Sequence, residues 1–221
     1  MSKIIVIGSN RGIGLELARQ FASRGDEVIA TCRQGSEALR TIPSIKVVTN
    51  VDIASRPSLD EFAAGVEANS IDVLVVVAGI LAPGGLDDLN VEDIRRQLEV
   101  NAIGPLQSVA ALRGTLGSGA KVALITSRMG SIADNTSGGS YGYRMSKAAL
   151  NMAGRSLAHD LRTSGVAVTL LHPGFVRTDM TRGAGNIDAD TSATGLIERI
   201  DALSMESSGR FLHQNGEELP W

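Results

Sequence analysis

The sequence predicts a doubly wound α/β fold with a mostly parallel sheet of about seven strands, and three observations support this prediction. Short apolar runs alternate with segments of helical periodicity about six times along the chain, which is typical of parallel strands joined by crossover helices. The first run, residues 4–7, suits a strand buried on both faces. A glycine-rich turn and a helical pattern follow it directly. With 221 residues the chain is too short for two ordinary α/β domains, so residues 1–221 form one domain.

Each strand is expected where an apolar run is bounded by glycine or polar residues: 4–7, 27–31, 45–48, 71–77, 121–125, 166–171 and 209–213. Helices are expected where apolar residues recur at helical spacing: 15–22, 36–40, 55–66, 90–112, 143–161 and 191–203. Ser55 and Pro57 are typical of an N-cap and a first turn, and a kink is expected at Pro105. Residues 131–139 read as a polar loop. Residues 178–190 carry no periodicity and are expected to be the most mobile segment.

The composition is that of a globular protein, with 43% apolar and 20% charged residues and a net charge of −3. This balance gives no indication of a nucleic-acid or membrane partner, and the longest apolar run, residues 73–82, is too short to span a bilayer. The first strand begins near Lys3, so we expect no signal peptide and a cytoplasmic location. Cys32 is the single cysteine, which excludes an intrachain disulfide. No metal site is expected.

The turn from Gly8 to Gly14 has the composition of a phosphate-binding loop. Its glycines, including Gly12, follow the spacing G-x-x-x-G-x-G. Without side chains, backbone N–H groups and the helix N-terminus can approach a phosphate closely. We therefore expect a dinucleotide here, with contacts from the intervening residues Asn10, Arg11 and Ile13. A tight turn that binds no ligand is the alternative interpretation.

The end of the second strand predicts which dinucleotide is bound. Proteins that use NAD usually place a carboxylate there for the ribose hydroxyls, but this chain has Arg33 and no acidic residue. A guanidinium suits a phosphate, and Arg11 can reach the same ribose from the glycine loop. The sequence therefore predicts NADP, with NADPH preferred over NADH. The alternative is that both arginines are solvated surface charges.

Tyr143 and Lys147 are four residues apart on one expected helix, so their side chains share a face. A free phenol titrates near 10, and a nearby ammonium can lower that pKa by about three units at an effective dielectric near 20. The pair can therefore form an acid–base unit. Such a spacing alone is also common on solvated helix surfaces.

The combination is more specific than its parts. The glycine turn, Ser127, Tyr143-xxx-Lys147 and Pro173-Gly174 occur in the order and at roughly the intervals of the short-chain dehydrogenase/reductase family, and the resemblance covers essentially the whole chain. Residues 140–151, SYGYRMSKAALN, and the C-terminal residues 209–221 resemble the carbonyl-reductase-like, C-factor-type branch. The resemblance implies a single Rossmann domain.

The resemblance also implies catalytic roles for four residues. Tyr143 would protonate the substrate carbonyl oxygen, and Ser127 would hydrogen-bond the same oxygen. Lys147 would lower the pKa of the tyrosine and hold the nicotinamide ribose, and Asn101 would hold a water that relays protons to Lys147. Ser131 is a rival for the serine role because the Ser127–Tyr143 interval is longer than usual; Ser127 is favoured because it ends a strand. Asn101 could instead be only a helix-terminal cap.

Further positions that resemble the family's cofactor contacts lie at the carboxyl ends of the later strands: Asp52, Ile53, Ala78, Gly79, Pro173, Gly174, Val176 and Thr178. Of these, Asp52 resembles the adenine-contacting residue. The Val176 backbone and the Thr178 hydroxyl would hold the carboxamide and phosphates. His172 and His159 are interpreted as structural.

Together these features predict an NADP-dependent oxidoreductase acting on CH–OH groups, a carbonyl reductase for a small aldehyde or ketone. The competing hypothesis is a dinucleotide-binding signalling or regulatory protein with incidental turnover. A nucleotide-sugar epimerase is a third hypothesis, although the chain is short for its substrate domain. Family members usually pair the helix of Tyr143 and the helix after Asn90 with symmetry mates, so a homodimer or a tetramer is expected.

Overall fold

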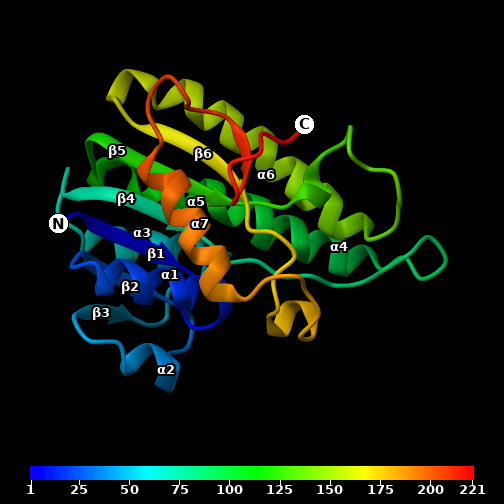
Figure 1. The fold of residues 1–221 in the computed structure, drawn as a ribbon, viewed down its shortest axis with the longest axis horizontal. Helices are drawn as coiled ribbons and strands as arrows, with labels where there is room; N and C mark the ends of the chain where they lie inside the picture. Colours follow the sequence, from blue (N-terminus) through cyan, green and yellow to red (C-terminus); the bar gives the residue numbers. More distant parts are fainter.

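The computed structural model describes residues 1–221 and contains one fully parallel sheet of seven strands in the order β3-β2-β1-β4-β5-β6-β7 (Figure 1). The strands are β1 (Lys3–Ile7), β2 (Glu27–Thr31), β3 (Ile45–Val48), β4 (Ile71–Val76), β5 (Leu116–Ile125), β6 (Ala167–His172) and β7 (Phe211–His213). This confirms the predicted doubly wound α/β fold. The order reverses between β1 and β4, the position where such sheets bind ligands.

Helices cover both faces of the sheet (Figure 1). On one face lie α1 (Gly12–Ser23), α2 (Glu37–Arg40) and α7 (Ala189–Asp201). On the other lie α3 (Arg56–Ala64), α4 (Val91–Leu98), α5 (Gly104–Leu112) and α6 (Tyr141–Asp160). None of them combines the length and apolar character that crossing a membrane requires.

The first strand shows why its four apolar residues are consecutive. Ile5 and Ile7 belong to the core beneath α3, α5 and α6, whereas Ile4 and Val6 belong to the core beneath α1 and α7. Successive strand side chains point to opposite faces, and both faces of β1 are covered. The strand is therefore buried on both sides, as predicted.

The helix that follows Asn90 continues past Pro105, as predicted, and its irregularity is a π-helical turn, Glu99–Ile103, between α4 and α5. The N–H of Gly104 donates to the carbonyl of Glu99, five residues earlier. A Cβ on Gly104 would lie 2.8 Å from Ile53, so the helix packs closely against the segment that follows β3. Single π turns often mark functional sites.

The clearest difference from the sequence prediction is the start of β5, at Leu116 instead of residue 121. Leu116 pairs with Ile71, and the register then shifts before Val73 pairs with Lys121. The glycines and polar residues of this irregular stretch carry no strand periodicity. At the other edge, β7 begins at Phe211, because Gly209 has a φ of +83° and turns the chain before the strand.

Candidate active site

A cavity of about 1070 Å³ lies at the carboxyl ends of the strands. Fifteen of the predicted cofactor-binding residues line it: Gly8, Asn10, Arg11, Gly12, Ile13, Gly14, Arg33, Asp52, Ile53, Ala78, Gly79, Tyr143, Lys147, Pro173 and Thr178. The other two, Gly174 and Val176, follow Pro173 in the same loop and do not line the cavity. The convergence expected from the strand ends is therefore observed.

The glycine loop at the end of β1 is built by close backbone contacts. A Cβ on Gly8, whose φ is +94°, would lie 2.7 Å from the nitrogen of Ala78, and a Cβ on Gly14 would lie 2.0 Å from the carbonyl oxygen of Gly8. The N–H groups of Gly8 and Ser9 both donate to the carbonyl of Thr31. The loop thus presents its backbone and the N-terminus of α1 to the cavity, which is a cradle suited to a phosphate.

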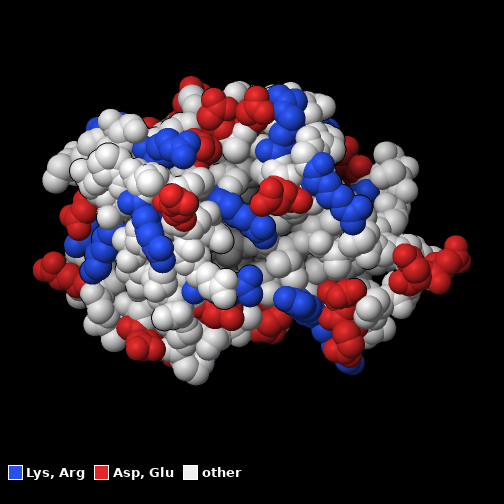
Figure 2. Space-filling view, turned by 90° about the horizontal axis from the view of Figure 1, so that it is seen from below, with Lys and Arg blue, Asp and Glu red and all other residues white.

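Five arginines line the cavity, and Lys and Arg side chains lie around the hollow visible in Figure 2. Arg11 pairs with Asp179 at 3.2 Å, and Arg95 and Arg177 also have carboxylate partners. Arg33 and Arg96 have none. Arg33 is thus an exposed, uncompensated cation at the end of β2, where no acid is present.

Ser127 lies beside Tyr143 and Lys147, which line the cavity, whereas Ser127 itself does not line it. Ser127 follows β5, and Tyr143 and Lys147 lie in the first two turns of α6. The hydroxyl of Ser127 lies close enough to Tyr143 to lower the pKa of the phenol, and it accepts from the N–H of Met129 at 3.2 Å. The ammonium of Lys147 is buried, donates to the carbonyl of Ile125 at 2.9 Å and lies 5.8 Å from the centre of the Tyr143 ring.

The pKa values of this group differ from the expectation. Burial raises the pKa of Tyr143, and the hydrogen bond to Ser127 lowers it by less, so the net shift is upward. Burial lowers the pKa of Lys147 to about 8. The lowering of the tyrosine pKa that was expected from Lys147 is not found, because desolvation penalises the phenolate more strongly. At neutral pH the phenol therefore keeps its proton, and Lys147 is mostly charged.

Ser131, the rival for the serine role, has a different environment. Its hydroxyl is buried and accepts from the N–H of Asp134 at 3.1 Å, which closes a turn of the loop. It is Ser127 that contacts Tyr143. The geometry thus favours the serine at the strand end.

Asn101 lies in the π-helical turn, in the middle of a continuous helix, so it is not a helix-terminal cap. Its side-chain amide bonds both polar groups of the Ile80 backbone at 2.8 Å and donates to Ser146 at 2.9 Å. A Cβ on Gly79 would lie 3.3 Å from Oδ1 of Asn101 and 3.7 Å from Nζ of Lys147. Asn101 therefore fixes the loop after β4 beside Lys147.

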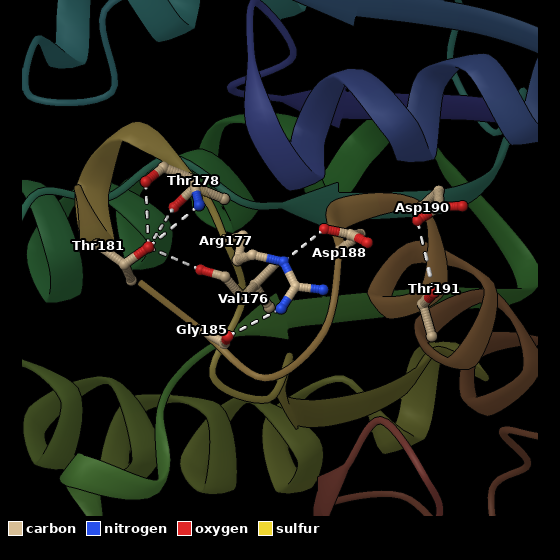
Figure 3. A network of polar contacts seen from close by, with 8 residues as sticks. All are labelled: Val176, Arg177, Thr178, Thr181, Gly185, Asp188, Asp190 and Thr191. Atoms are coloured by element: carbon tan, nitrogen blue, oxygen red, sulfur yellow. Dashed lines mark hydrogen bonds and ion pairs between the residues drawn. The ribbon is translucent and has the colours of Figure 1, made fainter. Parts of the chain in front are cut away.

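The segment after β6, expected to be irregular and mobile, is held by a dense polar network (Figure 3). The hydroxyl of Thr181 donates to the carbonyl of Val176 and accepts from the N–H of Thr178. Arg177 pairs with Asp188 at 2.7 Å and donates to the carbonyl of Gly185. These bonds place Thr178 against Gly12, 3.4 Å from the position of a Cβ there.

One wall of the cavity and one ion pair were not predicted from the sequence. Glu92, Arg95, Arg96 and Glu99 line the cavity from a single face of α4 and the π turn. Their spacing at three or four residues was a visible signal, because such residues share a helix face. The partner of Arg11, Asp179, is 168 residues away and gave no local signal.

Comparison with known proteins agrees with this geometry. The family model described as short chain dehydrogenase matches residues 2–187. This chain belongs to the short-chain dehydrogenase family. It is 43% identical over 227 residues, covering 100% of both chains, to 1-hydroxy-2-glutathionyl-2-methyl-3-butene dehydrogenase of Rhodococcus sp. (strain AD45).

Two further relatives of this short-chain dehydrogenase are informative. It is 47% identical over 163 residues to C-signal of Myxococcus xanthus, covering 72% of this chain and 98% of that protein. The structure of NADPH-bound carbonyl reductase from chicken fatty liver matches with a TM-score of 0.90 and 28% identity, covering 100% of this chain and 99% of the other. The carbonyl-reductase-like branch expected from the sequence is therefore confirmed.

Proposed function

We propose that this protein is an NADPH-dependent carbonyl reductase that transfers a hydride to a small aldehyde or ketone. The observation that carries the proposal is the proximity of the Ser127 and Tyr143 side chains to each other and to the buried ammonium of Lys147. Tyr143 can donate a proton to a substrate carbonyl oxygen, Ser127 can donate a hydrogen bond to that oxygen, and Lys147 provides a nearby cation. A protein that only binds a dinucleotide has no use for this set.

The cradle at the end of β1 fits a nicotinamide dinucleotide phosphate, because Gly8 and Gly14 allow a tight turn that places the loop backbone and the N-terminus of α1 at the cavity. Arg33, assisted by Arg11, would hold the 2′-phosphate. The other cofactor contacts would come from Asn10, Ile13, Asp52, Ile53, Ala78, Gly79, Pro173, Gly174, Val176 and Thr178. When bound, the cofactor supplies the hydride. Lys147 would bind the nicotinamide ribose and keep it oriented toward Tyr143.

During reduction, Oη of Tyr143 would donate its proton to the carbonyl oxygen while Oγ of Ser127 donates a hydrogen bond to the same oxygen. The raised pKa of Tyr143 keeps the proton in place before the reaction. The phenolate left behind would be stabilised by the charged ammonium of Lys147. Asn101 would hold a water that returns protons to Lys147. Its side chain is already bonded to Ile80 and Ser146, and Pro105, four residues on, has no N–H to donate to its main-chain carbonyl.

The proposal is tested by incubating the protein with a panel of aldehydes and ketones and either NADPH or NADH, and following nicotinamide absorbance. We expect NADPH oxidation with at least one small carbonyl, at a higher kcat/KM than with NADH. NADPH binding with no turnover of any carbonyl would favour the regulatory alternative instead.

A second candidate substrate follows from one relative. The Rhodococcus dehydrogenase, matched along its entire length, is named for an alcohol next to a glutathionyl thioether. The same Ser127, Tyr143 and Lys147 would then work in the oxidative direction, with a phenolate at Tyr143 removing the alcohol proton. Reduction of NADP⁺ or NAD⁺ by a glutathionyl alcohol, and not by the alcohol without glutathione, would identify this activity.

We further propose a homodimer, or a tetramer, in which the helices before and after β5 pair with symmetry mates. Ile103, Leu106, Met145 and Met152 are 41–69% exposed on α5, the adjoining π turn and α6. Sedimentation at micromolar concentration should give at least twice the monomer mass. A monomer would refute this assembly.

A further inference from the structure

The entry into the catalytic helix α6 has an unusual backbone. Gly138, Gly139 and Ser140 all have positive φ, at 65°, 65° and 47°. Residues with a Cβ rarely adopt this left-handed conformation, yet Ser140, with ψ 43°, stands directly before α6. Backbone of this kind persists only where the surrounding structure holds it in place.

The usual device for starting a helix is missing at this point. Ser140 occupies the N-cap position, but its side chain makes no capping hydrogen bond. Gly142, in the first turn, packs so closely against α4 that a Cβ there would lie 2.4 Å from the side chain of Gln97. One side of the first turn is therefore held by α4, and another contact must hold the left-handed turn.

Arg144 makes that contact. Its Nε lies 3.2 Å from the carbonyl oxygens of both Gly138 and Gly139, and its Nη2 donates to Oγ of Ser137 at 2.9 Å. Its own N–H donates to the carbonyl of Ser140 at 3.0 Å. One residue thus holds four consecutive residues of the loop. The planar guanidinium suits this task because its donors are fixed in one fork.

We propose that Arg144 is a positioning residue for the catalytic tyrosine. It adjoins Tyr143 in the sequence, and it ties the first turn of α6 to the loop that begins at Ser127. We expect these bonds to fix the hydroxyl of Tyr143 relative to that of Ser127, at the other end of the same loop. The inference rests on the proposed function, in which Ser127 and Tyr143 share one substrate oxygen.

The test compares Arg144→Ala and Arg144→Lys with Arg155→Ala, a control that removes an arginine of the same helix bonded only to the carbonyl of Gly209. For Arg144→Ala we expect kcat to fall about 10- to 100-fold, because small displacements of a catalytic group cost up to ~100-fold. Arg144→Lys should recover only part of the lost kcat, because one ammonium cannot reproduce the hydrogen bonds of the guanidinium to Ser137, Gly138 and Gly139. The Kd for NADPH should change less than threefold, and Arg155→Ala should match the unmodified protein.

Two further measurements separate positioning from a general loss of structure. Hydrogen exchange of the amides at residues 137–143 should be at least tenfold faster in Arg144→Ala, with the sheet unaffected. Adding Ser140→Gly to Arg144→Ala should restore part of kcat, because glycine adopts the left-handed conformation freely. A kcat within twofold of the unmodified protein, or a fall matched by equal losses in NADPH affinity and Tm, would overturn the proposal.

The activity of the unmodified protein and the exchange rates test the proposed function and the role of Arg144 separately. If the unmodified protein reduces no carbonyl, the proposed function fails, and the exchange rates alone decide the role of Arg144 in holding the turn. Unchanged exchange at residues 137–143 would then overturn the inference, and faster exchange would support it.

Discussion

The loops that follow β1 and β5 both border the cavity, but they are held in place in opposite ways. The loop after β1 depends on absent side chains, since Gly8 and Gly14 touch Ala78 and each other where a Cβ would not fit. The loop after β5 depends on long side chains and on distant chain segments. Arg128 pairs with Asp134, and the N–H of Ala133 donates to the carbonyl of Trp221, the last residue.

This difference matches what each loop is proposed to do. A phosphate site needs backbone N–H groups at close range, and such groups do not depend on which side chains are present. A substrate site needs specific side chains at fixed positions. The first loop is therefore expected to be most sensitive to added atoms, and the second to the loss of particular side-chain groups.

The largest effect expected from the loop after β5 distinguishes its two serines. Ser127→Ala removes the hydroxyl next to Tyr143 that is proposed to bond the substrate oxygen, and losing one such donor typically costs ~10²–10³ in kcat. Ser131→Ala removes only the bond to the N–H of Asp134, so kcat should fall less than tenfold. The two kcat values for one carbonyl substrate check this, and the reverse ranking would transfer the serine role to Ser131.

The loop after β1 is tested by one added methyl group. In Gly14→Ala the new Cβ would overlap the carbonyl oxygen of Gly8, at 2.0 Å, so the loop must shift. We expect a loss of about 1–3 kcal/mol in the free energy of unfolding and weaker NADPH binding, measured by urea unfolding and by titration. Gly84→Ala, where nothing lies within 4 Å, is the control. Equal stability of the two variants would contradict the close-packed loop.

Cofactor preference follows from Arg33. A hydrogen bond to a charged group is worth about 1.5–3 kcal/mol, so Arg33→Asp should weaken NADPH binding about 10- to 100-fold and leave NADH binding equal or stronger. Fluorescence titration with both reduced cofactors measures this. If the unmodified protein binds NADH as tightly as NADPH, the assignment of Arg33 and Arg11 to the 2′-phosphate is wrong.

A pH dependence of stability is expected at the end of β6. Burial, with His213, Arg128 and Lys147 adding smaller effects, lowers the pKa of His172 to about 3. An unfolded histidine titrates near 6.5, so between pH 6.5 and 3 the unfolded chain binds more protons. The stability that depends on neutral His172 is thus complete above pH 6.5 and is lost as the pH falls, by at most about 1.4 kcal/mol per pH unit.

Urea unfolding at several pH values tests this. His172→Gln should flatten the fall in stability below pH 6.5, whereas His159→Gln, at an exposed position, should not. If the curves of His172→Gln and the unmodified protein run parallel, His172 does not titrate as described.

The sequence predicted features whose causes are local. The strands, the N-cap of α3 and the glycine loop each follow from a few neighbouring residues, and all except the start of β5 were found near their expected bounds. The meeting of Ser127, Tyr143 and Lys147 was predicted because parallel strands and their following helices expose their ends at one edge.

Features that depend on pairs far apart in the chain were not predicted. Arg11 and Asp179 are 168 residues apart, and the polar network from Val176 to Asp188 has no periodicity. The pKa of Tyr143 was expected to fall because the spacing to Lys147 was visible, but burial, which raises it, depends on the complete fold. Likewise, the first half of β5 was not predicted, because Gly117 and Gly119 interrupt the apolar pattern there.

The most direct test of the account compares the two tyrosines, Tyr143 and Tyr141, which lie two residues apart. Tyr143→Phe keeps the buried ring and removes the proposed proton donor, whereas Tyr141→Phe changes a ring that is 39% exposed. With NADPH and a small ketone, we predict that Tyr143→Phe lowers kcat at least ~100-fold, with NADPH affinity nearly unchanged, and that Tyr141→Phe stays within about threefold. Turnover by Tyr143→Phe close to that of the unmodified protein would contradict the proposed chemistry.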